Sequence, residues 1–153
     1  MSIKFDSIIK EVKEKYTQLV LSKKFKYSDL PKRLPSAGIY FFSEDGIPLY
    51  VGRTNNLKKR LQYHTRNNHN QATFAFLLAR HETGNIKASY TKKGSRSDLL
   101  KDNVFREAFD RARERICHMD IQFVEESDPI NQTILEVYAA FESGAKYNNF
   151  DNH

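Results

Sequence analysis

Two tyrosines in a predicted β-hairpin are the residues at which acid–base chemistry is easiest to envisage. Residues 38–42 (GIYFF) and 47–51 (IPLYV) are rich in β-forming side chains and flank Glu44-Asp45-Gly46, a pattern typical of a hairpin. If these three residues form the loop, with its glycine in the left-handed position, Tyr40 lies directly opposite Tyr50 on one sheet face. Neighbouring phenols can bind or abstract a proton when one pKa is lowered. A cross-strand aromatic pair that only packs would show the same spacing.

A helix predicted over residues 56–65 carries a second pair of chemically useful side chains. Arg60 and His64 are four residues apart, so they share one helical face beside the apolar stripe of Leu57 and Leu61. At the edge of a buried face a side chain can be held rigidly and still reach solvent. An arginine in such a place can bind a phosphate through two hydrogen bonds. An ordinary surface arginine followed by a histidine at the helix end would give the same pattern.

The last predicted helix, from Pro129 to Phe141, contains a single charged residue, Glu136. On a helical wheel this glutamate lies away from an apolar stripe and is flanked by small or polar side chains. The stripe consists of Ile130, Ile134, Val137 and Phe141, and the flank of Gln132, Thr133, Ala139 and Ala140. A lone carboxylate on such a helix could bind a hard cation such as Mg²⁺. A solvated glutamate on the outer side of the helix would read the same way in the sequence.

The charge of the chain is unevenly distributed along its length. The net charge is +6, and from Gly46 to Ser97 the only acidic residue is Glu82. Such a polarised stretch can neutralise phosphates and release counterions, which favours binding to nucleic acid. A solvated positive face that only aids solubility is the alternative. The residues predicted to contact nucleic acid are Arg53, Lys58, Lys59, Arg66, Lys92, Lys93 and Arg96.

The elements that must position these residues indicate an α+β fold with a small mixed β-sheet, made of the hairpin plus a later strand and flanked by helices. Helices are predicted over residues 3–22, 56–65, 70–82, 98–118 and 129–141, a strand at 121–124, and a loop or short strand over 85–97. We expect one domain over residues 1–153. Its parts are an N-terminal helix and basic connector (1–36), a first motif block (37–66), a helical insert (67–118) and a final strand and helix block (119–149).

Composition excludes several classes of protein. No apolar run approaches the roughly 20 residues that span a membrane, and the charged, periodic N-terminus is unlike a signal peptide. Cys117 is the only cysteine, so neither a disulfide framework nor a cysteine-rich zinc site is expected. A reducing cytoplasm is the location this composition favours.

The order of the fragments resembles that of the GIY-YIG nuclease superfamily. The first block reads Gly38-Ile39-Tyr40, then Leu49-Tyr50-Val51-Gly52, then Thr54-Asn55-Asn56-Leu57-Lys58-Lys59-Arg60. In that family the two tripeptides lie on paired strands, the arginine lies on the next helix, and a later helix supplies a metal-binding glutamate that an asparagine follows. Glu136 stands in the place of this glutamate, and Asn148, with Asn149 as the alternative, in the place of the asparagine.

Two departures from the family pattern affect what we expect. The second motif has Val51 where the family pattern has isoleucine, and residues 67–118 are longer than a minimal family core. Relatives often carry a separate DNA-binding domain such as a zinc finger, for which this chain has no room. Specificity is therefore expected to come from the insert, the N-terminal helix, dimerisation as a homodimer, or a partner.

The resemblance implies an endonuclease that hydrolyses phosphodiester bonds in nucleic acid. Double-stranded DNA is the expected substrate, Mg²⁺ or Mn²⁺ the cofactor, and restriction, defence or a mobile element the setting. It implies Tyr40 as general base, assisted by Tyr50 and by His64, which stands where some restriction enzymes of the family carry a histidine. It implies Arg60 as the cation that neutralises developing charge, Glu136 as metal ligand and Asn148 as a supporting hydrogen-bonding residue.

Two other functions stay open at this point. One is a non-cleaving nucleic-acid-binding module of the same shape, and the other is a structure-specific repair nuclease that depends on a partner. Retention of Tyr40, Tyr50, Arg60 and Glu136 together favours the enzyme.

Overall fold

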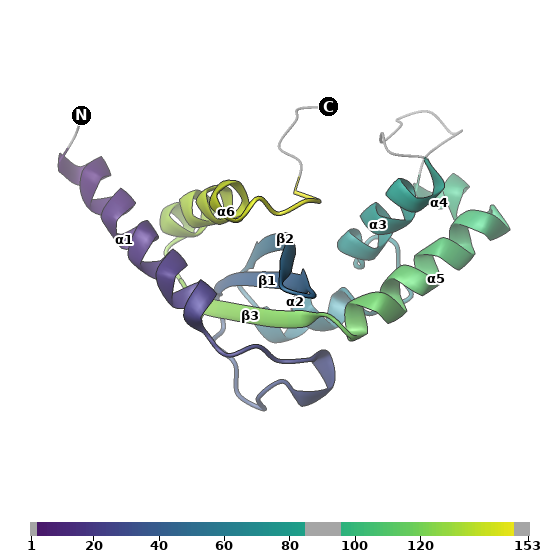
Figure 1. Ribbon diagram of the computed structural model, residues 1–153, viewed down its shortest axis with the longest axis horizontal. Coiled ribbons are helices and arrows are strands. Elements are labelled where there is room, and N and C mark those ends of the chain that lie inside the picture. The colour runs from purple at the N-terminus through teal and green to yellow at the C-terminus, as the bar shows by residue number, and fades with distance from the viewer. Residues whose placement is uncertain (1–2, 85–95, 149–153) are drawn as a thin grey trace. The chain divides into compact units, whose positions relative to one another are not determined.

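An antiparallel sheet of three strands combines a hairpin from the first half of the chain with a strand from the second half. The computed structural model describes residues 3–84 and 96–148, whose elements are labelled in Figure 1. Strand β1 (Gly38–Glu44) lies between β2 (Ile47–Thr54) and β3 (Asp120–Glu125). The α+β class and the sheet of a hairpin plus a later strand are confirmed. The expected mixed sheet is wrong, because β3 adds beside β1 and pairs antiparallel with it, whereas a place beside β2 would have made a parallel pair.

Most helices follow the predicted segments, but a short 3₁₀ helix lies in the predicted connector and the helix predicted over 98–118 is interrupted. The helices are α1 (Ile3–Leu21), the 3₁₀ helix η1 (Tyr27–Asp29), α2 (Leu57–Tyr63), α3 (Thr73–Thr83), α4 (Arg96–Leu99), α5 (Asn103–Cys117) and α6 (Pro129–Ser143). The helix expected over 98–118 is divided into α4 and α5. Asp102 accepts a hydrogen bond from the Val104 N–H at 3.0 Å and caps α5. A capping residue has a non-helical backbone, so the helix cannot run through it. Of residues 85–97, expected as a loop or short strand, 85–95 lie outside the described part, and 96–97 instead begin α4.

The hairpin turn is one residue shorter than expected. Asp45 and Gly46 both have positive φ, at 53° and 79°. Positive φ at both central residues defines the two-residue turn that Asp-Gly favours, because its twist matches that of the strands. Pairing therefore begins with Glu44 opposite Ile47.

One face of the sheet is covered by α1 and α6 (Figure 1). Its core consists of Val12, Leu19, Ile39, Phe41, Val51, Val124, Leu135, Ala139 and Ala140. The buried amide of Gln122, on β3, holds the end of α1 through hydrogen bonds from Nε2 to the carbonyls of Leu19, Val20 and Ser22 (3.3, 3.2 and 2.9 Å).

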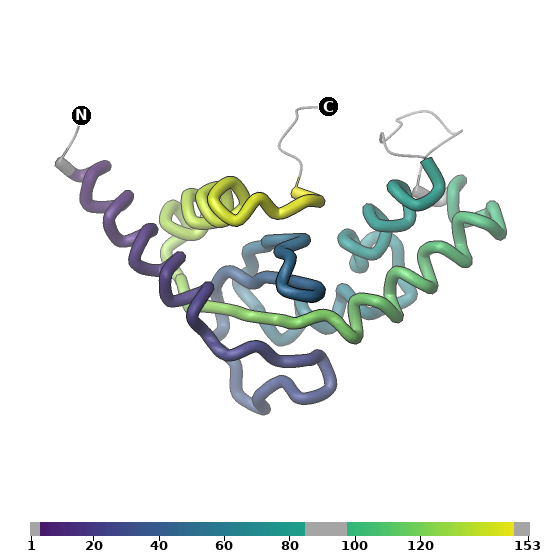
Figure 2. Tube along the Cα trace, in the orientation of Figure 1, coloured from purple at the N-terminus to yellow at the C-terminus, as the bar shows by residue number. Residues whose placement is uncertain are grey.

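Two irregular segments complete the edges of the sheet. The connector after α1 forms a bridge between Phe25 and Ile121 at β3, where the Phe25 ring stacks on Phe123 at 5.9 Å. After α6 the chain turns at Gly144 and runs beside β2, as the trace in Figure 2 shows. There the Tyr147 N–H donates to a β2 carbonyl at 2.9 Å. Both segments supply backbone partners to strands that would otherwise end the sheet.

Residue contacts divide the chain into two units, Met1–Arg60 with Met119–Asn148, and Leu61–His118 with Asn149–His153. The sheet belongs to the first unit. In the second, α3 packs on α5, and the Phe76 ring contacts Phe105 and Phe109 at centroid distances of 5.0 and 6.1 Å. An ion pair of 2.6 Å between Arg111 and Glu82 joins the two helices at the surface. This unit contains the residues of the predicted helical insert.

Candidate active site

The two tyrosines of the hairpin share one sheet face, but they are not directly opposite each other. Tyr40 pairs with Gly52, and Tyr50 pairs with Phe42. The Tyr40 and Tyr50 ring centroids are 6.5 Å apart, which suits diagonal neighbours. The expectation of a shared face is confirmed, and the expectation of a direct cross-strand pair is wrong.

A bulge in β2 brings the tyrosines to the same face. After the two-residue turn, unbroken pairing would put Tyr40 opposite Val51 and leave Tyr50 on the other face, because side chains alternate along a strand. The register instead shifts between Ser43 and Phe42, where β2 holds one extra residue, Leu49. A bulge of this kind turns all following side chains over. The shared face therefore depends on the turn and the bulge together.

Gly52 makes room for the Tyr40 phenol. A methyl group added at Gly52 would lie 2.2 Å from Cζ and Oη of Tyr40, far inside van der Waals contact. The phenol must therefore lie directly over the β2 backbone at this glycine. Tyr40 is 1% exposed, so it is held on its other sides as well. The final glycine of the second motif is needed because no other residue leaves this space.

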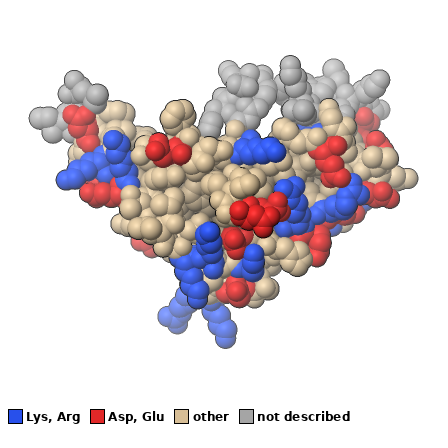
Figure 3. Space-filling model, viewed as in Figure 1, with Lys and Arg blue, Asp and Glu red and all other residues tan. Residues whose placement is uncertain are grey.

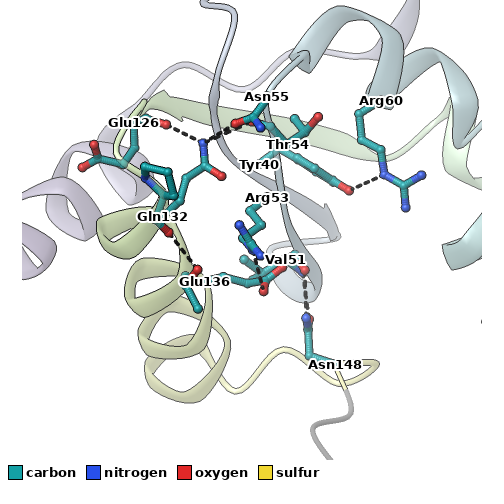
Figure 4. A network of polar contacts seen from close by, with 12 residues as sticks. Tyr40, Val51, Arg53, Thr54, Asn55, Arg60, Glu126, Gln132, Glu136 and Asn148 are labelled. Carbon is teal, nitrogen blue, oxygen red and sulfur yellow. Dashed lines mark hydrogen bonds and ion pairs between the residues drawn. The ribbon is translucent and has the colours of Figure 1, made fainter.

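Arg60 connects α2 to the tyrosines. Its Nε donates a hydrogen bond of 3.3 Å to Tyr40 Oη, shown by the dashed line in Figure 4. Position 60 is fixed by the start of α2, where Asn56 accepts from the Lys59 N–H at 3.1 Å and caps the first turn. Arg60 is half-buried. Burial alone would lower the pKa of Arg60, but charge and hydrogen bonding from Tyr40 and Tyr50 outweigh it and raise that pKa.

The Tyr40 phenol is held in its protonated form. Burial raises its pKa well above the usual range, and the nearby Tyr50 adds to this effect. The charge and hydrogen bond of Arg60 act in the opposite direction, and the carboxylate of Glu136 raises the pKa further. All three side chains are therefore close enough to Tyr40 for electrostatic coupling.

Glu136 lies on the inner side of α6. The residues buried along this helix are Gln132, Leu135, Ala139 and Ala140. Most of the apolar stripe instead faces solvent: Ile130, Val137 and Phe141 are exposed by 62%, 46% and 83%, whereas Ile134 packs partly buried against the core. The alternative of a glutamate on the outer side of the helix is therefore wrong. The two small alanines let α6 approach the sheet closely, which brings the flank of Glu136 inward.

The Glu136 carboxylate has a cationic neighbour on β2. Its Oε1 is 3.8 Å from Nε of Arg53, and the two side chains are exposed by 24% and 43% (Figure 4). Burial raises the pKa of Glu136, and Arg53 opposes that rise. The site thus holds a partly desolvated carboxylate whose charge is stabilised by the guanidinium and the backbone of Arg53.

Asn148 fixes the strand between Tyr50 and Gly52. The Val51 N–H donates to Asn148 Oδ1 and Asn148 Nδ2 donates to the Val51 carbonyl, both at 2.8 Å (Figure 4). The side-chain amide therefore replaces one residue of a missing neighbouring strand. Asn149, the alternative at this place, lies outside the described residues.

Comparison with known families decides the assignment. Residues 36–107 match the family described as the GIY-YIG catalytic domain. By this match, residues 36–107 belong to the GIY-YIG catalytic domain family. The match includes Tyr40, Tyr50 and Arg60, whereas Glu136 and Asn148 lie beyond it.

The GIY-YIG chain has further relatives among known proteins. Over 38 residues it is 40% identical to the UvrABC system protein C of Deinococcus radiodurans, a match that covers 25% of this chain and 6% of that protein. Two solved structures of the GIY-YIG N-terminal endonuclease domain of UvrC from Thermotoga maritima are 18% and 19% identical, with TM-scores of 0.40 and 0.38. Both are point mutants bound to a catalytic divalent cation, and each alignment covers 97% of this chain and 99% of the solved chain. In residues 3–84 and 96–148 of this GIY-YIG chain, every helix is too short or too polar to cross a membrane.

His64 occupies a different environment from the expected one. The GIY-YIG chain ends α2 at Tyr63, and the following histidine is fully buried, with its ring edge-on to Phe74 at 6.4 Å. The expectation that His64 reaches solvent from a helix face is wrong. His64 lies one residue beyond the end of α2, and its ring is buried against Phe74. Within its own unit it packs as an aromatic side chain.

The predicted nucleic-acid contacts are only partly within the described structure. Arg53, Lys58, Lys59 and Arg66 are exposed, and Arg66 lies over the Tyr63 ring at 5.3 Å. Lys92, Lys93 and the side chain of Arg96 lie outside the described part. The connector before β1 adds further exposed cations that the sequence reading did not assign: Lys23, Lys24, Lys26, Lys32 and Arg33. In Figure 3 basic side chains project from this connector, whereas on α5 basic and acidic side chains are mixed.

The side chains described at this site can be tested for their fit to a divalent cation. The described residues contain no group of three or more histidine, cysteine or acidic side chains that could enclose a metal. Glu136 offers a carboxylate that is partly desolvated and 24% exposed. Mg²⁺ keeps several waters and is commonly held by one or two carboxylates together with substrate phosphates. The residues present fit that arrangement and do not fit a closed zinc or calcium site.

Proposed function

We propose that this GIY-YIG domain is a divalent-metal-dependent endonuclease that hydrolyses phosphodiester bonds in DNA, with Mg²⁺ or Mn²⁺ as cofactor. The observation that carries the proposal is the 3.3 Å hydrogen bond from Arg60 to Tyr40, beside Tyr50 and within the field of Glu136. These side chains offer a proton acceptor, a fixed cation and a metal-binding carboxylate in one place. Each of these can lower the barrier to phosphodiester hydrolysis.

In the proposed reaction Tyr40 takes a proton from the attacking water. Because the resting phenol is protonated, its proton must leave first, and cations gathered at the site favour the phenolate. As the new bond from water oxygen to phosphorus forms, the bond to the leaving oxygen breaks, and Arg60 stabilises the charge on the phosphoryl oxygens. A divalent cation held by Glu136 would supply Lewis-acid assistance to the phosphate and the leaving oxygen.

The remaining site residues have supporting roles in this proposal. Tyr50 orients water or phosphate beside Tyr40, since it is partly exposed and close to the same arginine. Asn148 holds the β2 backbone that both tyrosines depend on. We assign His64 a packing role, because it is fully buried against Phe74.

The exposed cations of the GIY-YIG chain would bind the DNA backbone. Neutralising Lys58 and Lys59 together should weaken DNA binding and flatten its salt dependence by about one unit of slope per lost phosphate contact. Replacing Lys92, Lys93 and Arg96 is the parallel experiment for the insert. An unchanged slope of log affinity against log salt concentration would show that the altered residues form only a solvated face. A homodimer, a cytoplasmic location and a restriction, defence or mobile-element role belong to this proposal too.

Digestion of a supercoiled plasmid with Mg²⁺ or Mn²⁺ tests the proposed activity. We expect nicked and linear products that disappear with a chelator and in the Glu136→Ala variant, which should still bind DNA. Binding without any cleavage would instead indicate a non-cleaving module. Cleavage confined to branched or damaged DNA, or to reactions with an added partner, would indicate a repair nuclease.

A further inference from the structure

Gln132 joins three segments that meet at the active site. It lies on α6, one helical turn before Glu136, and is 1% exposed. Its Nε2 donates to the carbonyl of Glu126 at 2.7 Å, to Oδ1 of Asn55 at 3.2 Å and to the carbonyl of Thr54 at 3.3 Å (Figure 4). One side chain therefore connects α6 to the end of β2 and to the end of β3.

These hydrogen bonds lie beside the ion pair of the site. Thr54 follows Arg53 along β2, and Arg53 is the residue whose guanidinium faces Glu136. The same amide thus fixes the helix that carries the carboxylate and the strand that carries its cationic neighbour. Backbone and amide oxygens buried without a donor are costly, so the arrangement resists small shifts of α6 against β2.

We propose that Gln132 is a positioning residue. It fixes where Glu136 lies, along the axis of α6, relative to the tyrosines on β1 and β2. Glu136 itself contacts Arg53 on β2, whereas the buried neighbours of Gln132 on α6 have no side-chain donor: Leu135, Ala139 and Ala140. Apolar contacts of this kind hold the helix against the sheet but let it slide along the helix axis. The directional bonds of Gln132 oppose that sliding from a position one turn away from the Glu136–Arg53 contact. The inference rests on the proposed function where it predicts a loss of kcat. Its prediction for the position of Glu136 does not depend on that function.

The chain supplies a matched control in Gln122. This glutamine is also buried, at 6% exposed, and its Nε2 also donates to three oxygens, but it fixes the end of α1 and not the site. Gln132→Glu and Gln122→Glu each replace the amide donor with a carboxylate. The oxygens that accepted from the amide would repel this carboxylate. Gln132→Met and Gln122→Met remove the donor without adding charge, at similar length, and serve if a glutamate variant does not fold.

The experiment compares each Gln132 variant with its Gln122 counterpart. Thermal midpoints report the shared structural cost, and the binding of Mn²⁺ alone, followed by electron paramagnetic resonance of the free ion, reports on Glu136 without any cleavage. We expect similar losses of thermal stability in both series. Only the Gln132 series should bind Mn²⁺ more weakly and lose kcat, each by about 10- to 100-fold, with KM for DNA nearly unchanged.

Two outcomes separate this inference from the proposed function. If Gln132 variants match their Gln122 counterparts in Mn²⁺ binding and kcat, Gln132 is only a structural residue and the inference is wrong. If the wild-type protein binds Mn²⁺ but cuts no DNA, the proposed activity fails, and the Mn²⁺ comparison still decides the role of Gln132.

Discussion

Replacing Gly52 with alanine should lower the cleavage rate, because the new methyl group would displace the Tyr40 side chain. The added Cβ would lie 2.2 Å from Cζ and Oη of Tyr40, whereas ordinary contact begins at 3.4 Å. The phenol must therefore move by about 1.2 Å, the difference between these two distances. It cannot stay bonded to Arg60 in the same geometry, since that bond is already 3.3 Å long.

The size of the effect follows from this displacement. A shift of about 1 Å in a reacting group can cost roughly 10²-fold in rate, and complete loss of a general base costs about 10²–10⁴-fold. We expect Gly52→Ala to lower the single-turnover cleavage rate within this range, with DNA affinity nearly unchanged. Glycine-to-alanine changes inside strands ordinarily stabilise by about 0.5–1 kcal/mol. Here overpacking should reverse the sign and destabilise by about 1–3 kcal/mol.

A double-mutant cycle with Tyr40→Phe tests the reasoning. If Gly52→Ala acts by displacing the Tyr40 hydroxyl, adding it to Tyr40→Phe should cost little further rate, because the hydroxyl is already absent. Gly38→Ala is a stability control, since its methyl group would meet the Val124 carbonyl oxygen at 2.1 Å and not the phenol. Near wild-type cleavage by Gly52→Ala, or full additivity with Tyr40→Phe, would refute the argument.

Three further predictions follow from the site. Tyr40→Phe should lower the cleavage rate by about 10²–10⁴-fold with unchanged DNA affinity, and Tyr50→Phe should lower it by less. Since burial raises the pKa of Tyr40, the wild-type cleavage rate should rise with pH through neutrality, and a flat profile would contradict this. Glu136→Gln should abolish metal-dependent cleavage yet raise the thermal midpoint, because burial raises the pKa of Glu136 and ionising it costs stability. That gain should be absent below the ordinary glutamate pKa and complete above the raised one, so calorimetry at about pH 4 and about pH 8 checks it, and equal gains would count against it. Asn148→Ala leaves the Val51 N–H and carbonyl without their partner and should lower the free energy of urea unfolding by about 1–3 kcal/mol; no measurable loss would show that water replaces the amide.

The sequence by itself determined the elements and the order of the motif residues. Helix and strand positions could be read from apolar periodicity and turn residues, because these signals act over a few neighbouring residues. Tyr40, Tyr50 and Arg60 were recognisable from their order, and the structure places them together. The break before α5 also had a local signal, the capping residue Asp102, which the long charged pattern concealed.

Local patterns could not decide which face of α6 is buried. Most of its apolar stripe, including Val137 and Phe141, faces solvent, and its mildly polar flank with Gln132 and Glu136 faces the sheet. A helical wheel assigns the inner face by hydrophobicity alone. Here close approach through small residues and hydrogen bonds to β2 decides it, and those partners lie about 80 residues away in the chain.

Only the tertiary structure decided how the hairpin aims its tyrosines. The turn at Asp45-Gly46 alone would have put Tyr40 and Tyr50 on opposite faces, and the extra residue Leu49 reverses this. The carbonyl of Leu49 is taken by the Tyr147 N–H, from a segment that returns after α6. A one-residue insertion in a strand has no signature in side-chain alternation until its partners are known, because its energy depends on hydrogen bonds that distant residues supply.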